Sequence, residues 1–175
     1  FCLAWIGWHL PETHQLVPVA ECGDQTQYLK TITVYVDDRP EGHGPSGTAF
    51  RTGQPYICND ALTDPATIPW RPALEHRGFQ ASAALPIRVN GAVSGTLSVY
   101  AGERNFFHDR EIGLLEEAVT DISFALDNFE REAARRLAEQ TVRNEKQFSD
   151  MMIESMPGIL YFYDSTGQFL RWNRN

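Results

Sequence analysis

One helical pattern in the C-terminal part of this 175-residue sequence limits what the chain can fold into. Apolar residues recur about every 3.6 positions, and no glycine or proline interrupts the run before Pro157. A continuous helix over 109–156 would measure about 70 Å at about 1.5 Å per residue, which is longer than one ordinary domain. The stripe contains Leu115, Val119, Ile122, Leu126, Phe129, Ala133, Leu137, Phe148 and Met151, with polar Gln140 and Asn144 after Leu137.

The middle of this helix is mostly charged between Glu130 and Lys146. A lone helix of that kind gains little stability in water. We therefore expect a parallel homodimer, in which the polar seam positions hold the register at some cost in stability. The predicted dimerisation residues are Val119, Ile122, Leu126, Phe129, Ala133 and Leu137. A solvated linker helix without a partner is the alternative.

The start of the helix carries a capping signature near His108. Phe107 is positioned to pack against Ile112, and Glu111 supplies the acid at the third helical position. We expect the helix to begin there.

Strand and turn signals fill the sequence before this helix. The pair Asn90-Gly91 stands between two apolar runs and predicts a tight hairpin, because both turn positions need a positive φ. A second hairpin is predicted for Phe1–Leu10 and Gln15–Cys22, and further strands for Ile32–Val36 and Tyr56–Cys58. Short helices are predicted from Ser46, as the N-cap, to Arg51 before Gly53, and at Arg71–His76. The result is an α+β fold, an antiparallel sheet flanked by helices with a long C-terminal helix.

Charge and composition restrict the kinds of partner. The formal net charge of −8 argues against nucleic acid and against a lipid surface, because both bind clustered Lys and Arg. The three cysteines show no paired spacing, which suits a reducing compartment, and no apolar run reaches the roughly 18 residues of a membrane span. We expect a cytoplasmic protein.

Several stretches taken together resemble the GAF domain family. They are Gly44 to Pro55 (GPSGTAFRTGQP), Asn59-Asp60, Ala83 to Ile87 (AALPI) with Gly91 to Tyr100, and Phe107 to Glu111 (FHDRE) followed by Leu114-Leu115. The resemblance covers residues 1–127, without the family's opening helix, and implies a GAF/PAS-like sheet.

The sequence after residue 127 is similar to the relay segments of bacterial signalling proteins. Residues 128–155 would form the signalling helix, and 156–175 resemble the beginning of a PAS domain, with strands at Gly158–Tyr163 and Phe169–Trp172. This order implies two-component or cyclic di-GMP signalling, with a histidine kinase, diguanylate cyclase or phosphodiesterase as the output.

The resemblance also implies a pocket for an unknown small ligand. We expect its lining among large aromatic residues and a few polar ones, namely Trp5, Tyr35, Phe50, Asp60, Trp70, Phe79, Ser82 and Ser98. The same aromatic residues could equally be plain core or dimer contacts. The first hypothesis is accordingly a noncatalytic ligand sensor, and the second a structural transmitter that binds nothing.

Other chemistry finds little support. Residues 42–47 match G-x-G-x-x-G, but acidic residues precede them and Pro45 lacks a donor N–H, so they predict a turn leading into a helix. A GAF-fold methionine sulfoxide reductase would use Cys22 and Cys58, yet no cationic activator stands near either. No histidine pair has metal-ligand spacing, although His76 could serve as a single axial haem ligand. We expect no metal site and no enzyme activity, and the cofactor is unknown.

Overall fold

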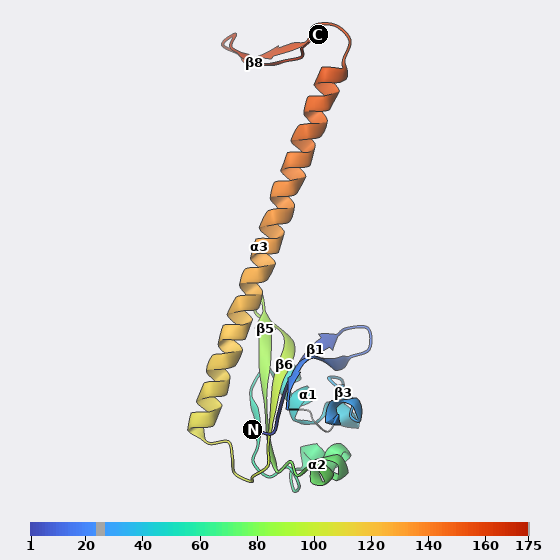
Figure 1. The fold of residues 1–175 in the computed structure, drawn as a ribbon, viewed down its shortest axis with the longest axis vertical. Coiled ribbons are helices and arrows are strands. Elements are labelled where there is room, and N and C mark those ends of the chain that lie inside the picture. The colour runs from blue at the N-terminus through green and yellow to red at the C-terminus, as the bar shows by residue number, and fades with distance from the viewer. Residues whose placement is uncertain (24–26, 175) are drawn as a thin grey trace. The chain divides into compact units, whose positions relative to one another are not determined.

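The strands β5 (Ala81–Val89) and β6 (Ala92–Ala101) lie inside the sheet of this computed structural model, which describes residues 1–23 and 27–174 (Figure 1). The sheet has six strands in the order β3-β2-β1-β6-β5-β4, and every neighbouring pair is antiparallel. Its other strands are β1 (Leu3–Leu10), β2 (Gln15–Cys22), β3 (Val34–Tyr35) and β4 (Tyr56–Cys58). The predicted α+β fold is confirmed.

Both predicted hairpins are confirmed. Asn90 and Gly91 have φ values of 50° and 81° and join β5 to β6, as an Asn-Gly turn requires. The first hairpin pairs β1 with β2. The strand predicted for Ile32–Val36 is shorter than expected, since only Val34–Tyr35 pairs with β2.

Short helical segments connect the remaining strands. They are η1 (Tyr28–Lys30), η2 (Pro40–Gly42), α1 (Pro45–Thr52), η3 (Pro65–Trp70) and α2 (Arg71–Arg77). Gly53 ends α1 with φ 65°, as predicted. The predicted N-cap was wrong: Gly44 caps α1, and Ser46 lies inside it. The fixed φ of Pro45 suits the first helical position, and the helix therefore starts two residues earlier than predicted.

Each face of the sheet is covered by a different layer (Figure 1). The first part of α3 (Asp109–Ser155) covers one face, and α1 and α2 lie on the other. The α3-side core contains Ala81, Ala83, Leu85, Ile87, Val99, Ala101, Phe107, Leu115 and Val119. The α2-side core contains Leu3, Trp5, Leu16, Tyr28, Leu29, Val34, Val36, Cys58, Ala61, Trp70, Leu74, Phe79 and Tyr100.

The start of α3 is held by the side-chain amide of Asn59, which follows β4. Asn59 Nδ2 donates to the carbonyl oxygen of Phe107 at 2.9 Å, and Asn59 Oδ1 accepts from the Phe107 N–H at 2.9 Å. The predicted cap is also present, because Glu111 Oε2 accepts from the His108 N–H at 3.3 Å. Phe107 is 2% exposed, so this double hydrogen bond holds a buried anchor of the α3-side core.

Two further hydrogen bonds hold α3 along β5. Ser123 Oγ accepts from the Arg88 N–H at 3.0 Å, and Asp127 Oδ1 accepts from the Asn90 N–H at 2.7 Å. The helix is thus attached to the sheet both at its start and at the tip of the β5–β6 hairpin, which we call the central hairpin.

Residues Phe1–Asp127 form one compact unit and Asn128–Asn175 a second. In the second unit, α3 continues to Ser155 and is followed by β7 (Tyr161–Tyr163) and β8 (Phe169–Trp172), which pair as an antiparallel hairpin. The two predicted strands are confirmed, although the first begins at Tyr161. The continuous helix is confirmed as well.

Asn173 joins the helix end of the second unit to its hairpin. Its Oδ1 accepts from the Leu160 N–H at 2.8 Å, and its Nδ2 donates to the carbonyl oxygens of Met156 and Gly158 at 3.3 and 2.7 Å. An ion pair between Arg171 and Asp150 adds a second connection. In the part of the chain that the structure describes, no helix is long and apolar enough to cross a membrane.

The Asn59 contact yields a stability prediction. Replacing Asn59 with Ala removes both hydrogen bonds to Phe107, and we expect the free energy of unfolding to fall by about 1–3 kcal/mol. Asn59→Asp is the matched control, because a carboxylate still accepts from the Phe107 N–H but cannot donate to its carbonyl. Urea unfolding should show Asn59→Asp to be at least as destabilised as Asn59→Ala, because one carboxylate oxygen then faces the Phe107 carbonyl oxygen and two acceptors repel. Equal stability of Asn59→Ala and wild type would contradict this role.

Candidate functional site

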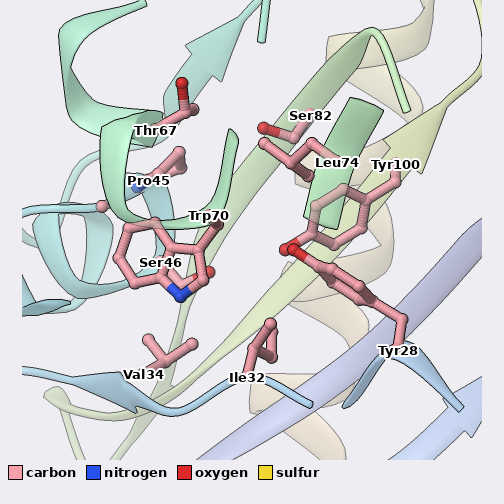
Figure 2. A pocket seen from close by; sticks show the side chains of 11 residues that line it. Tyr28, Ile32, Val34, Pro45, Ser46, Thr67, Trp70, Leu74, Ser82 and Tyr100 are labelled. Carbon is pink, nitrogen blue, oxygen red and sulfur yellow. The ribbon is translucent and has the colours of Figure 1, made fainter. Parts of the chain in front are cut away.

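A pocket lies between the central hairpin and the layer formed by η1, α1, η3 and α2 (Figure 2). Its hollow measures about 340 Å³ when the part open to solvent is included, but side chains leave only about 20 Å³ in which water can sit. That space holds roughly one water molecule. The lining residues are Tyr28, Ile32, Val34, Gly44, Pro45, Ser46, Thr67, Trp70, Leu74, Ser82 and Tyr100.

Trp70 fills one side of the pocket by lying against the backbone of Gly44. A Cβ atom added to Gly44 would come within 2.3 Å of Trp70 Cζ3 and 2.5 Å of Cη2. Only glycine therefore lets the indole lie in this place. Trp70 stands at the junction of η3 and α2 and is 9% exposed.

Two tyrosines form the other side. The rings of Tyr28 and Tyr100 meet edge to face with centroids 5.6 Å apart, and Phe79 packs against both at 5.3 and 5.1 Å. Figure 2 shows both hydroxyl groups pointing from these rings toward Trp70. Burial raises the pKa of the Tyr100 hydroxyl above its ordinary value.

Smaller hydroxyl groups complete the lining. Ser46 Oγ lies 2.8 Å from Ser98 Oγ, which links α1 to β6 inside the protein. Thr67 Oγ1 lies 2.6 Å from the carbonyl oxygen of Ala61 and 2.8 Å from that of Asp64, and its one proton serves both. Ser82 is 4% exposed on β5. The pocket thus presents neutral polar groups on an otherwise apolar wall.

The structure brings only part of the predicted ligand-binding set to this pocket. Trp70 and Ser82 line it. Ser98 and Phe79 stand one layer behind, since they contact the lining residues Ser46, Tyr28 and Tyr100. Trp5 is buried in the α2-side core without lining the pocket.

The other three predicted residues have partners elsewhere. Tyr35 accepts a hydrogen bond from Gln15 and lies under the guanidinium of Arg39. The Phe50 ring contacts that of His9, with centroids 4.6 Å apart and the planes tilted by 50°. Asp60 forms an ion pair with Arg104 at 3.6 Å.

Sequence reasoning did not name the two tyrosines. Tyr100 could have been found, because it is two residues from Ser98 on the same strand and alternation places both on one face. Tyr28 belongs to a single helical turn without periodicity, so no local signal marks it.

The glycine motif at 42–47 contributes close packing. Pro45 opens α1 after a turn, as predicted. Gly44 accommodates Trp70, while a Cβ on Gly47 would come within 2.5 Å of the Tyr35 carbonyl oxygen. These contacts account for two of its three glycines.

No cysteine or histidine of the described residues lines this pocket. Burial raises the pKa of the Cys58 thiol to about 12, so at neutral pH it is no thiolate nucleophile, whereas Cys2 and Cys22 are exposed. His76 is exposed on α2 and does not line the pocket. Across residues 1–23 and 27–174, no group of three His, Cys, Asp or Glu side chains could hold a metal ion.

The predicted dimerisation residues fall into two groups. Val119 is buried in the α3-side core, and Ile122 and Leu126 pack against that core within the same chain. Phe129 and Leu137 are 72% and 67% exposed, and Ala133 is exposed as well. The exposed half of the stripe is therefore the part available to a partner.

Comparison with known proteins adds the family context. A family model described as a GAF domain matches residues 4–127. No curated protein matches the chain.

Solved structures share the fold at low sequence identity. A domain of a protein described as a two-component sensor histidine kinase from Sinorhizobium meliloti 1021 is 18% identical, covering 77% of this chain and 84% of that one, with a TM-score of 0.57. A GAF domain/HD domain protein from Geobacter sulfurreducens is 15% identical (74% and 82% covered, TM-score 0.59). Free methionine-R-sulfoxide reductase from Neisseria meningitidis, solved with its substrate, is 16% identical (76% and 71% covered, TM-score 0.58).

Burial of the Cys58 thiol leads us to expect a loss of stability at alkaline pH. The pKa of this thiol rises from an ordinary 9.0 to about 12 in the folded chain. Between those values the unfolded chain releases the proton while the folded chain keeps it, so the free energy of unfolding falls as pH rises. From pH 8 to pH 10 this group should contribute a loss of about 1 kcal/mol.

Urea unfolding at the two pH values measures this loss. Cys58→Ala should reduce the difference between pH 8 and pH 10, whereas Cys22→Ala, at an exposed site, should leave it as in the wild type. An unchanged difference in Cys58→Ala would show that the thiol is not protected by burial.

Proposed function

Since this chain belongs to the GAF domain family, a family of signal-sensing modules, we propose that it binds a small ligand in the pocket beside Trp70 and relays the signal through α3. The observation that carries the proposal is that the central hairpin contributes side chains both to the pocket and to the α3-side core. Ser82 and Tyr100 line the pocket, while Ala81, Ala83 and Val99 on the same strands contact the α3 side. A ligand that moves β5 or β6 would move the surface on which α3 packs.

A second connection runs from the pocket to the start of α3. The lining residue Thr67 donates to the carbonyl of Ala61, two residues after Asn59. Asn59 in turn holds the backbone of Phe107. In this proposal a ligand acts by favouring one of two arrangements of α3, because equal affinity for both would shift nothing.

The relay itself is proposed to be a homodimer formed through the exposed half of the α3 stripe. Phe129, Ala133 and Leu137 lie on one face and are open to solvent. On the surface beside them, Glu132 pairs with Arg135 and Arg136 within the same helix. This arrangement suits two parallel helices whose flanks are charged.

The segment from 156 onward is proposed to be the beginning of a PAS domain that receives this motion in a cytoplasmic bacterial signalling protein. The β7–β8 hairpin supports this, since its strands are exposed and a two-stranded hairpin is at best marginally stable alone. The output domain of that signalling protein would be a histidine kinase, a diguanylate cyclase or a phosphodiesterase.

One observation favours the alternative of a structural transmitter. The pocket holds only about 20 Å³ of water-accessible space, which is little room for a ligand unless side chains move. In that case the domain dimerises and transmits without binding a small molecule.

The dimer proposal predicts a face-specific effect on assembly. Leu137→Glu places a charge in the seam, and we expect the dissociation constant of the dimer to rise at least about tenfold. Val142→Glu is the control, because Val142 is also exposed, at 65%, but five residues further on and therefore away from the seam. Sedimentation velocity measures both, and native mass spectrometry of the wild type would show a dimer with any retained ligand. A monomeric wild type would exclude this relay.

We also propose that the domain is not an enzyme. The Neisseria meningitidis neighbour is a methionine sulfoxide reductase, but its fold alone is shared. Purified protein should therefore not reduce free methionine sulfoxide in the presence of a thiol reductant. Activity that disappears in the Cys22→Ser, Cys58→Ser double variant would overturn this expectation.

A further inference from the structure

We propose that the pocket beside Trp70 selects a small uncharged ring compound carrying a hydrogen-bonding group, and that this ligand enters by displacing the Trp70 indole from Gly44. The inference rests on the proposed sensor function and specifies what is sensed. It follows from three features of the lining: its charge, the direction of its polar groups and the packing of Trp70.

The lining excludes a charged ligand. Of the lining residues, all within the described part of the chain, none has a charged side chain. The Asp64 carboxylate does not line the pocket, and it accepts from the Tyr56 hydroxyl at 3.1 Å and from the Ala66 N–H at 2.8 Å. A buried ion without a counter-ion is strongly disfavoured, so carboxylates, phosphates and ammonium ions are poor candidates.

The polar groups favour a ligand that exchanges hydrogen bonds. Figure 2 shows the hydroxyl groups of Tyr28 and Tyr100, and not their ring faces, directed toward Trp70; the two side chains also share a hydrogen bond, which leaves further donor and acceptor capacity on the pair. A cage for a cation would need the ring faces instead. With Ser82 on the wall beside them, the hydroxyl groups suit a neutral amide, carbonyl or hydroxyl.

Trp70 is the part of the lining whose movement makes room. The indole is held by contact with Gly44, at the joint between η3 and α2. Its ring occupies the space that a planar ligand would need, because the remaining cavity holds roughly one water molecule. Displacement of Trp70 couples binding to the η3–α2 layer, and through Thr67 to Ala61 and Asn59.

A set of ring compounds that differ in charge tests the proposal. Benzamide, benzoate and benzamidinium have nearly the same shape but are neutral, anionic and cationic at neutral pH, and phenol and benzyl alcohol extend the neutral group. Binding to the full chain is measured by ligand-observed NMR, and tryptophan emission reports the environment of Trp70. Trp70→Phe serves as the control that should lose most of the emission change.

A variant inside the pocket and a matched variant outside it show where the compound binds. Ser82→Leu adds bulk inside the pocket, and Ser94→Leu makes the same change on β6 outside it. If Ser82→Leu does not fold, Ile32→Phe is used instead. It enlarges a half-buried side chain that also lines the pocket. We expect at least one neutral compound to bind ten times more tightly than benzoate and benzamidinium and to shift the tryptophan emission. The affinity for this compound should fall tenfold in Ser82→Leu and should not change in Ser94→Leu.

The other outcomes separate this inference from the sensor function. A charged compound that binds as tightly as benzamide and is lost in Ser82→Leu would overturn the neutral class and leave the sensor standing. Binding to the wild type without an emission shift would overturn the displacement of Trp70. If none of the compounds binds, the neutral-ring proposal fails. If native mass spectrometry then also shows a dimer without added mass, the sensor function fails with it.

Discussion

The central hairpin is buried on both of its faces, and a different layer covers each. Seven consecutive residues of β5, Ala81–Ile87, are buried, which is the pattern of a strand packed on both sides rather than on one. The α3 helix covers one face, and the layer of α1, η3 and α2 covers the other. The pocket and the helix that would report on it are therefore built on opposite sides of the same two strands, separated by one layer of backbone.

Local signals were sufficient for most of the fold. The Asn90-Gly91 turn needs two positive φ values, and the helix from Asp109 has an uninterrupted stripe and a cap, so neither depends on distant residues. The Ser46 cap failed because Pro45 competes for the first helical position and the hydroxyl of Ser46 is used by Ser98, 52 residues away. A contact of that separation leaves no mark in a local pattern.

Residue type predicted only part of the candidate site. Trp70 and Ser82 were found, but the aromatic residues Tyr35 and Phe50 lie with Arg39 and His9 instead. Aromatic content alone does not separate a pocket from a core, since large rings fill both. What distinguishes the pocket is the close approach of Trp70 to Gly44 and the direction of two tyrosine hydroxyls, and both are tertiary features.

The stripe along α3 serves two different surfaces in turn. Up to Leu126 it packs on the sheet of its own chain, and from Phe129 onward the same face is exposed. The apolar residues of the sequence recur about every 3.6 positions in both halves, and we propose that a rotation of α3 imposed by the sheet is passed on to the exposed half. In the proposed dimer, the small Ala133 and the polar Gln140 and Asn144 would make that half a weak seam, which a modest change in free energy could shift between two registers.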